Sequence, residues 1–424
     1  MRRRRPCRSY ERMKGAAPPS DPPAVLQTIS VLEAAGQDQH GSFVDETIGI
    51  VARHGGDIVS FAVGSPAPEA LALARVDELV ADVLARDGMR ALNYGVTEGE
   101  PELREIIAAG ARSRGIDASP ADVIVTAGAL QAIDLACRVF LRPGDLVVTE
   151  SPAFANALSA FRNHGARILE VPADDHGIDV SAAARALRQR GERAKLFFIV
   201  PNFQNPTGAT LSDERRDALL ALAASQGAVV VEDDPYAALR YRGDDLVPLA
   251  ARARERVLHL GSFSKTFLPG IRVGWAVADP LTVRRMAAAK QTMDSSTSTL
   301  GQRLVVAFHR RGAVAEHLAA LRRLYAEKQA AARAALAREF AGTAGVSWND
   351  PEGGFYLWLR TTGVSTRDLL DAALEEGVTF VPGDAFTTTT GSRDALRFSY
   401  CAPLPDRIAE GVRRLRRAID RVVR

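Results

Sequence analysis

The sequence has little cysteine, few histidines and no long apolar run. Its three cysteines, Cys7, Cys137 and Cys401, are odd in number and far apart, so we expect neither a disulfide framework nor a cysteine metal site. The seven histidines are scattered without the spacing of metal ligands. No apolar run approaches the ~20 residues that cross a bilayer. These absences predict a cytoplasmic protein with no metal and no membrane partner.

Excess positive charge is confined to one end of the chain. The net charge is +3, but residues 1–14 contribute +6 (seven basic residues and one acidic residue), which leaves −3 for the other 410 residues. This mild acidity excludes a general nucleic-acid-binding surface. Residues 15–23 are small, polar and Pro-rich, unlike the apolar core of a secretory signal. We therefore expect residues 1–40 to be a disordered basic tail or an over-extended start.

Short apolar runs alternate with amphipathic stretches from about residue 76. PELREIIAAGARSRG predicts a helix from Pro101 to Gly115, and another helix is capped by Ser212. Runs such as DVIVTAG, DLVVTE, KLFFIVP and AVVVED are apolar throughout, as in strands buried on both faces. The alternation predicts an α/β fold with a mostly parallel, seven-stranded-type sheet flanked by helices.

The pattern changes after about residue 300. Residues 310–342 are mostly helical, and the short runs FYLWLR, VTFVPG and LRFSY precede a final Arg-rich helix. We expect a smaller α+β domain here. The predicted division is a tail at 1–40, an arm joining the small domain at 41–75, a large domain at 76–300 and a small domain at 301–424.

Lysine is the rarest cation, since the 54 basic residues include only Lys14, Lys195, Lys265, Lys290 and Lys328. Lys265 lies in GSFSKTFLPGIRVGW, among hydroxyls and glycines. A lysine forms imines and an arginine does not. An imine-forming lysine needs an aldehyde cofactor, and pyridoxal 5'-phosphate is the commonest.

Three further stretches follow predicted strands, where open α/β sheets bind ligands: TAGALQ (126–131), PNFQNPTG (201–208) and VEDDPYAALRY (231–241). Each alone is compatible with a plain turn. Together with the Lys265 stretch they offer a partner for every group of the cofactor. The phosphate needs hydroxyls, a guanidinium and a helix N-terminus, the pyridine nitrogen a carboxylate, and the ring oxygen hydrogen-bond donors. The candidates are Ser262, Ser264, Arg272, Gly128 and Ala129 for phosphate, Asp233 for the nitrogen, and Asn205 and Tyr236 for the oxygen.

The set S-x-S-K-x-x-x-P-G-x-R-x-G, with N-P-T-G and D-x-x-Y upstream, resembles the class I/II aminotransferases among the fold-type I pyridoxal-phosphate enzymes. The resemblance covers residues 41–420 and is greatest to the branch of 2-aminoadipate and kynurenine aminotransferases and MocR-type regulators. It implies an aspartate aminotransferase-like fold, pyridoxal 5'-phosphate as cofactor, and an amino acid and a 2-oxo acid (2-oxoglutarate or pyruvate) as substrates.

The resemblance also implies roles for individual residues. Lys265 would carry the cofactor as a Schiff base and move the substrate proton. Asp233, Tyr236 and Asn205 would hold the ring, and Phe154 would stack on it in place of the usual tyrosine. The phosphate site would comprise Gly128, Ala129, Leu130, Ser262, Ser264 and Arg272, with Ala129 and Leu130 standing where relatives offer a hydroxyl or amide side chain. Gly64, Asn205 and Arg397 would bind the substrate, and Tyr94 would reach the neighbouring subunit's phosphate, which implies a homodimer with shared active sites.

Two other functions remain open from the sequence. The same scaffold supports other pyridoxal-phosphate reactions, namely a decarboxylase, a lyase or an O2-using oxidase or hydroxylase. A MocR-type ligand-sensing module would need a winged helix-turn-helix of ~60–70 residues, for which residues 1–40 are too short and too rich in Pro and Arg. Cys401, beside the Arg397 stretch, is expected to be a small buried filler.

Overall fold

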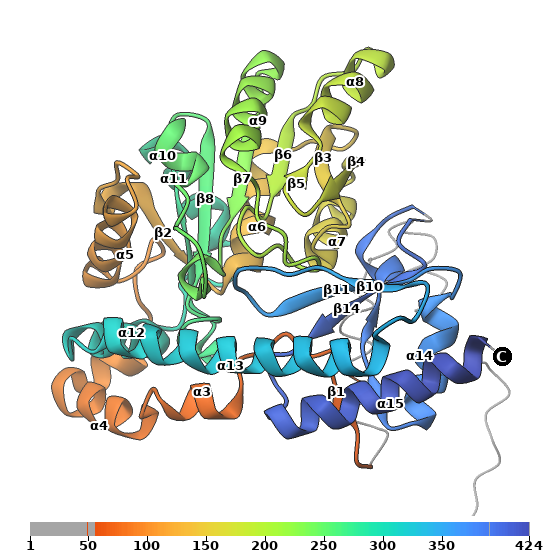
Figure 1. Cartoon of the computed structure of the whole chain (residues 1–424). Helices are drawn as coiled ribbons and strands as arrows, with labels where there is room; N and C mark the ends of the chain where they lie inside the picture. Colours follow the sequence, from red (N-terminus) through yellow and green to blue (C-terminus); the bar gives the residue numbers. More distant parts are fainter. Residues whose placement is uncertain (1–48, 50–55, 390, 424) are drawn as a thin grey trace, which may run out of the picture. The chain divides into compact units, whose positions relative to one another are not determined.

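The structure, a computed structural model, describes residues 49, 56–389 and 391–423, all within the compact unit His40–Arg424 (Figure 1). The predicted tail and most of the predicted arm lie outside the described residues. The α/β architecture with a second, smaller sheet is confirmed.

The large sheet has eight strands in the order β2-β9-β8-β7-β6-β3-β4-β5. Strands β3, β4, β6, β7 and β8 run parallel, and β9 runs antiparallel to both of its neighbours, β8 and β2. The sheet has one strand more than the seven that the sequence predicts, because β5, a two-residue strand, adds to its edge. The bounds are β2 (Val123–Thr126), β3 (Leu146–Ser151), β4 (Arg167–Asp174), β5 (Gly177–Ile178), β6 (Leu196–Ile199), β7 (Val229–Asp233), β8 (Val257–Ser262) and β9 (Gly274–Val277).

Helices cover both faces of this sheet (Figure 1). The alternation of side chains along β2 shows why, because Val123 and Val125 enter one apolar cluster and Ile124 enters another. The first cluster includes side chains of α5, α8, α9 and α12, and the second those of α6, α7 and α11. The bounds are α4 (Val76–Asp87), α5 (Pro101–Ser113), α6 (Ala129–Phe140), α7 (Ala155–Asn163), α8 (Val180–Arg190), α9 (Asp213–Gln226), α10 (Leu249–Arg252), α11 (Pro280–Gln291) and α12 (Thr299–Arg310).

One helix prediction is wrong at its end, and another is confirmed with one break. Helix α5 begins at Pro101 as expected but ends at Ser113, because the chain turns at Gly115, whose φ is +86°. The helical stretch predicted over residues 310–342 is the end of α12 and a separate helix, α13 (Val314–Phe340), divided by a turn at Gly312, whose φ is +71°. The Ser212 cap is confirmed, since its Oγ accepts the backbone N–H of Arg215.

The smaller sheet is antiparallel, with the order β10-β11-β14-β13. The run VTFVPG, predicted as one strand, forms two, because β12 pairs with β1 while β13 pairs with β14. Short 3₁₀ turns lie at Gly88–Leu92, Pro120–Asp122, Ala237–Leu239, Pro269–Ile271 and Gly383–Phe386. The remaining bounds are β1 (Val59–Ser60), α3 (Pro68–Ala72), β10 (Val346–Trp348), β11 (Tyr356–Thr361), α14 (Thr366–Glu375), β12 (Val378–Thr379), β13 (Val381–Pro382), β14 (Ala395–Ser399) and α15 (Pro405–Val423).

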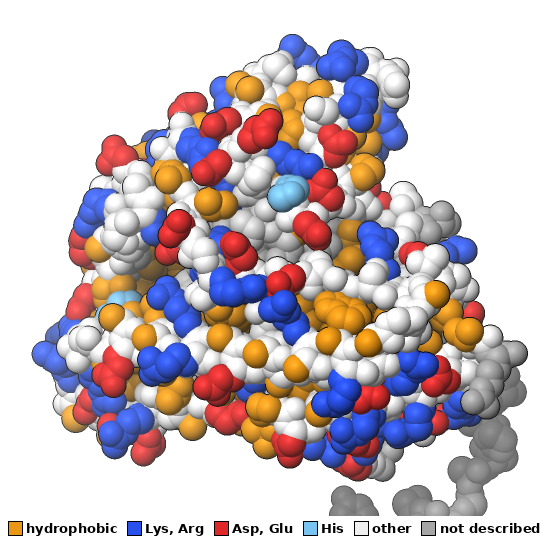
Figure 2. All heavy atoms as spheres, in the orientation of Figure 1, with side chains coloured by type: hydrophobic (Ala, Val, Ile, Leu, Met, Phe, Trp, Pro, Cys, Tyr) orange, Lys and Arg blue, Asp and Glu red, His pale blue; other side chains and the backbone are white. Residues whose placement is uncertain are grey.

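The basic face of α15 is neutralised by ion pairs. Arg414 contacts Asp57 and Glu410, and Arg417 contacts Glu376. On the face of the molecule shown in Figure 2, positive and negative side chains are interspersed over α13 and α15. Within the described residues, no helix has the length and apolarity to span a membrane. Nor do the described residues contain a cluster of metal-binding side chains.

Candidate functional site

The four stretches singled out in the sequence meet at one edge of the large sheet. They follow the carboxyl ends of β2, β6, β7 and β8. Strand β2 points the same way as β8 because both are antiparallel to β9. The carboxyl ends of these four strands therefore share an edge, the usual ligand-binding edge of such a sheet.

Lys265 follows β8 directly and projects toward the segment after β1. Its Nζ donates a hydrogen bond to the carbonyl oxygen of Gly64 at 2.9 Å and lies 5.7 Å from the centre of the Tyr236 ring. Burial disfavours the charged form of the amine and lowers the pKa of Lys265 to about 8. A substantial fraction of the amine is then neutral near physiological pH, as a nucleophile or general base requires.

Asp233 ends β7 and is buried. Its Oδ1 has no hydrogen-bond partner among the described residues. Burial and the neighbouring charge of Asp234 raise the pKa of Asp233 to about 7, against a smaller opposing effect of Lys265. A buried carboxylate with a free oxygen lacks a cation or N–H donor. A protonated pyridine nitrogen supplies both.

Arg397, on β14, brings the small sheet into the site. Its Nη1 donates to Oδ1 of Asn205 at 2.9 Å, and its Nη2 donates to the carbonyl oxygen of Ala62 at 2.6 Å. Its Nε is buried and without a partner among the described residues. The guanidinium lies 4.8 Å from the centre of the Tyr356 ring. This buried, incompletely paired guanidinium suits a carboxylate.

Ser262, Ser264 and Arg272 form a cup with the turn before α6. The Ser264 N–H donates to Oγ of Ser262 at 3.1 Å, and Arg272 donates to Oγ of Ser264 at 3.4 Å and to the carbonyl oxygen of Ala127 at 3.2 Å. Gly128 has a φ of +82°, and a Cβ there would collide with the Arg272 guanidinium. The N-terminus of α6 has no side-chain cap, so its backbone N–H groups can bind an anion.

These groups fit pyridoxal 5'-phosphate. The cup suits a phosphate, Asp233 suits the ring nitrogen, and Lys265 suits the aldehyde. Tyr236 is buried beside Lys265, whereas Leu130 is partly exposed and can contribute only its backbone to the cup. Phe154 precedes α7 and is partly buried against the apolar cluster that contains side chains of α6, α7 and α11.

Tyr94 is not brought to this site within one chain. Its side chain is 87% exposed. It lies at a surface recess lined by residues 91–94 and 296–300.

Sequence reasoning missed Tyr356. Its hydroxyl lies 3.1 Å from that of Tyr236, its ring contacts Arg397, and its oxygen occupies the space that a Cβ on Gly64 would need. The run FYLWLR does not predict these contacts, because Tyr356 has the same pattern as any other apolar position of a buried strand.

A buried relay behind the phosphate cup was also missed. The fully buried Lys290 donates to Oδ1 of Asp294 at 2.8 Å, and Asp294 Oδ2 accepts from Gln131 at 2.9 Å. Gln131 in turn accepts the backbone N–H of Ala127 at 2.7 Å. The relay holds the turn 126–131 in place. The spacing of Lys290 and Asp294, four residues apart on one helix end, is the signal that could have revealed it.

Comparison with known proteins identifies the family of the chain. Residues 57–415 match the family described as "Aminotransferase class I and II". The 2-aminoadipate transaminase of Thermus thermophilus is 40% identical over 402 residues, which cover 93% of this chain and 98% of the transaminase. The crystal structure of LysN, the alpha-aminoadipate aminotransferase of the same species, complexed with N-(5'-phosphopyridoxyl)-L-leucine, matches with a TM-score of 0.84 and 38% identity, covering 92% of this chain and 97% of that one.

Other relatives fall in the same branch. The kynurenine aminotransferase of Pyrococcus horikoshii matches with a TM-score of 0.87 and 34% identity, over 94% of this chain and 100% of that one. Helix-turn-helix regulators also match, among them the probable rhizopine catabolism regulatory protein MocR of Rhizobium meliloti, which is 29% identical over 77% of this chain and 65% of the regulator.

Proposed function

Because the chain belongs to the family of class I and II aminotransferases, which makes it a pyridoxal-phosphate-dependent aminotransferase, we propose that it transfers the amino group of an L-amino acid to 2-oxoglutarate or pyruvate in the cytoplasm. The observation that carries the proposal is that one edge of the sheet holds both a lysine amine, bonded only to the Gly64 carbonyl oxygen among the described residues, and the buried carboxylate of Asp233, whose Oδ1 has no partner there. Asp233 ends β7, and Lys265 lies three residues after the end of the neighbouring strand β8.

Each residue of the site has a separate role toward the cofactor or the substrate. When bound, pyridoxal 5'-phosphate supplies an aldehyde for the amino group and a ring that delocalises electrons from the substrate Cα. Asp233 keeps the ring nitrogen protonated, and Tyr236 and Asn205 bind the ring oxygen. Lys265 would hold the cofactor through its amine, and its pKa of about 8 suits that amine to take and return the proton at the substrate Cα.

Substrate binding involves both sheets of the molecule. Arg397 orients the α-carboxylate with its unpaired Nε, and Asn205 fixes the guanidinium. Gly64 restrains the Lys265 amine through its carbonyl oxygen. We accordingly assign the cofactor to a large domain (76–300) and the carboxylate clamp to a small domain (301–424), with 41–75 as the arm between them.

We further propose a homodimer with shared active sites. Tyr94 is exposed, and we expect it to reach the phosphate bound by a second subunit, while Phe154 stacks on the ring. A mixture of Lys265→Ala and Tyr94→Ala chains tests this, since one site of each mixed dimer has both residues intact. Regained turnover is expected, and a mixture no more active than its parts would refute shared sites.

An amino-donor panel with 2-oxoglutarate or pyruvate tests the reaction itself. Glutamate or alanine should form in equal amounts to the oxo acid of the donor. Lys265→Ala and Lys265→Arg should both lose turnover and the visible absorbance of the bound cofactor. A fully active Lys265→Arg chain would overturn the assignment.

Other outcomes point away from transamination. Release of CO2 or consumption of O2 without any acceptor would indicate another pyridoxal-phosphate reaction. Tight, sequence-specific binding of DNA by the purified chain would indicate a regulator.

A further inference from the structure

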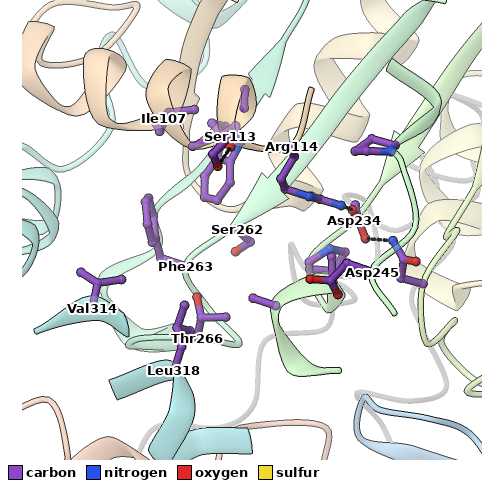
Figure 3. Close-up of a pocket in the computed structure, with 18 of the residues that line it drawn as sticks. Ile107, Ser113, Arg114, Asp234, Asp245, Ser262, Phe263, Thr266, Val314 and Leu318 are labelled. Atoms are coloured by element: carbon purple, nitrogen blue, oxygen red, sulfur yellow. Dashed lines mark hydrogen bonds and ion pairs between the residues drawn. The ribbon is translucent and has the colours of Figure 1, made fainter. Parts of the chain in front are cut away.

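A second cavity, of about 590 Å³, lies next to the segment that carries Lys265. It shares Ser262 with the phosphate cup, but Lys265, Asp233 and Arg397 do not line it. Figure 3 shows it between α5, the Lys265 segment and the start of α13. Its volume is in the range of small-molecule sites. Four residues that flank Lys265 form part of its wall: Ser262, Phe263, Thr266 and Phe267.

One side of the cavity is apolar and rich in aromatic rings. Phe267 stacks on Phe308 with ring centres 4.5 Å apart, and Phe263 lies 4.7 Å from Trp275. Figure 3 shows this side carrying Ile107, Phe263, Val314 and Leu318. Such a wall favours a flat apolar body through burial of area and ring contacts.

The opposite side is polar, and most of its charges are already paired. Arg114 donates to Asp234 at 2.7 Å, and Asn202 donates to the same carboxylate at 2.8 Å (Figure 3). Arg240 contacts Glu352 and lies 3.5 Å from Asp245.

Arg322 stands apart from these pairs. Its Nε donates to the carbonyl oxygen of Ala238 at 2.8 Å, and its two Nη groups have no bonded partner among the described residues. The charged residues that line the cavity are three arginines and two aspartates (Arg114, Arg240, Arg322, Asp234 and Asp245), an excess of one positive charge. A carboxylate is the group that a free guanidinium edge binds best.

We propose that this cavity binds a small aromatic carboxylate, with its ring against the wall of Phe263 and Ile107 and its carboxylate on Arg322. The occupant would contact residues that flank Lys265, so the cavity is a binding site beside the proposed catalytic site. Its existence does not depend on the reaction proposed above, because occupancy is measured without turnover.

The test uses 3-(4-fluorophenyl)propionate and ¹⁹F NMR on the full chain with bound pyridoxal phosphate. The expected spectrum has two bound signals, one from the Arg397 site and one from the cavity. Arg397→Met should remove the first and keep the second. Arg322→Met should weaken the second about tenfold or more, as expected for the loss of a charge-assisted hydrogen bond, whereas Arg323→Met, at the next position and exposed, should leave both signals intact.

A filling variant gives a second, independent readout. Gly110 lies on α5 and lines the cavity, and a Cβ built there meets no atom within 4 Å. Gly110→Phe should abolish the cavity signal, and Ala109→Phe, on the exposed neighbouring position of the same helix, should keep it. The proposal is overturned by a single bound signal that Arg397→Met removes, or by a cavity signal that survives both Gly110→Phe and Arg322→Met. Failure of turnover with both signals present would refute the proposed function alone.

Discussion

Replacing Asp233 with asparagine should stabilise the protein when no cofactor is bound, and should lower turnover when the cofactor is bound. The side chain is buried, with an oxygen that has no partner among the described residues. Its ordinary pKa of 3.8 is raised to about 7 by burial and by the charge of Asp234. Below pH 3.8 the carboxyl is protonated in the folded and the unfolded chain alike, so it has no effect on stability there.

The magnitude follows from this interval of pH. Above pH 3.8 the unfolded chain releases the proton, while the folded chain keeps it until about pH 7. The folded state therefore loses stability across this window, by about 4 kcal/mol in total at 1.36 kcal/mol per pH unit. Above pH 7 the loss is constant. The asparagine does not titrate. Between pH 4 and pH 8, the free energy of unfolding of Asp233→Asn should therefore rise by about 4 kcal/mol relative to that of the native chain.

The assay is urea unfolding of both chains at several pH values, with and without pyridoxal phosphate. With the cofactor bound, Asp233 would hold a positive ring nitrogen, so the advantage of the variant should vanish, and turnover should fall at least about 10²-fold. Asp234→Asn is the matched control, because the Arg114 guanidinium and the Asn202 amide hold the pKa of Asp234 below its ordinary value. That variant should lose stability above pH 4. Parallel pH profiles for the native chain and Asp233→Asn would refute the reasoning.

Three further changes test the surroundings of the site. Gly64→Ala would place a Cβ against the Tyr356 hydroxyl and displace the carbonyl that accepts a hydrogen bond from Lys265. Steady-state kinetics should show kcat lowered about tenfold or more. An unchanged kcat would contradict the close packing. Burial, and after it the Tyr356 hydroxyl, raises the pKa of Tyr236. Tyr356→Phe should therefore move the alkaline limb of the pH–rate profile to lower pH, and an unmoved limb would exclude the coupling. Lys328→Met leaves the carbonyl oxygens of Ala402 and Pro403 and the carboxylate of Glu69 without their buried donor and should cost about 2 kcal/mol of unfolding free energy. Lys195→Met, at an exposed site, should change it by less than about 0.5 kcal/mol.

The parts of the site that could be predicted are those in which local pattern and fold rule coincide. Asp233 and Lys265 each follow an apolar run short enough to be a buried strand, and the rule for strand ends then places both at one edge. The cup could be anticipated for the same reason, since Gly128 precedes an amphipathic helix whose N-terminus attracts anions.

What escaped prediction depends on contacts between distant segments. The direction of β9 is set by pairing with β8 and β2, and an apolar run reads the same in either direction. VTFVPG splits into β12 and β13 because its two halves find different partner strands. Tyr356 joins the site through three residues far from it in the chain: Gly64, Tyr236 and Arg397. The cavity likewise forms only where α5 and α13 meet the Lys265 segment.

The scarcity of lysine has a practical consequence for chemical labelling. Lys290 and Lys328 are buried with their amines bonded to acceptors, and Lys195 is exposed. An aldehyde or an active ester added to the protein therefore meets few competing amines, because the surface cations are almost all guanidinium groups. Hydride reduction of the cofactor-bound protein followed by peptide mapping should mark chiefly the peptide that contains Lys265. Coupling to a solid support, for the same reason, should be directed to carboxylates.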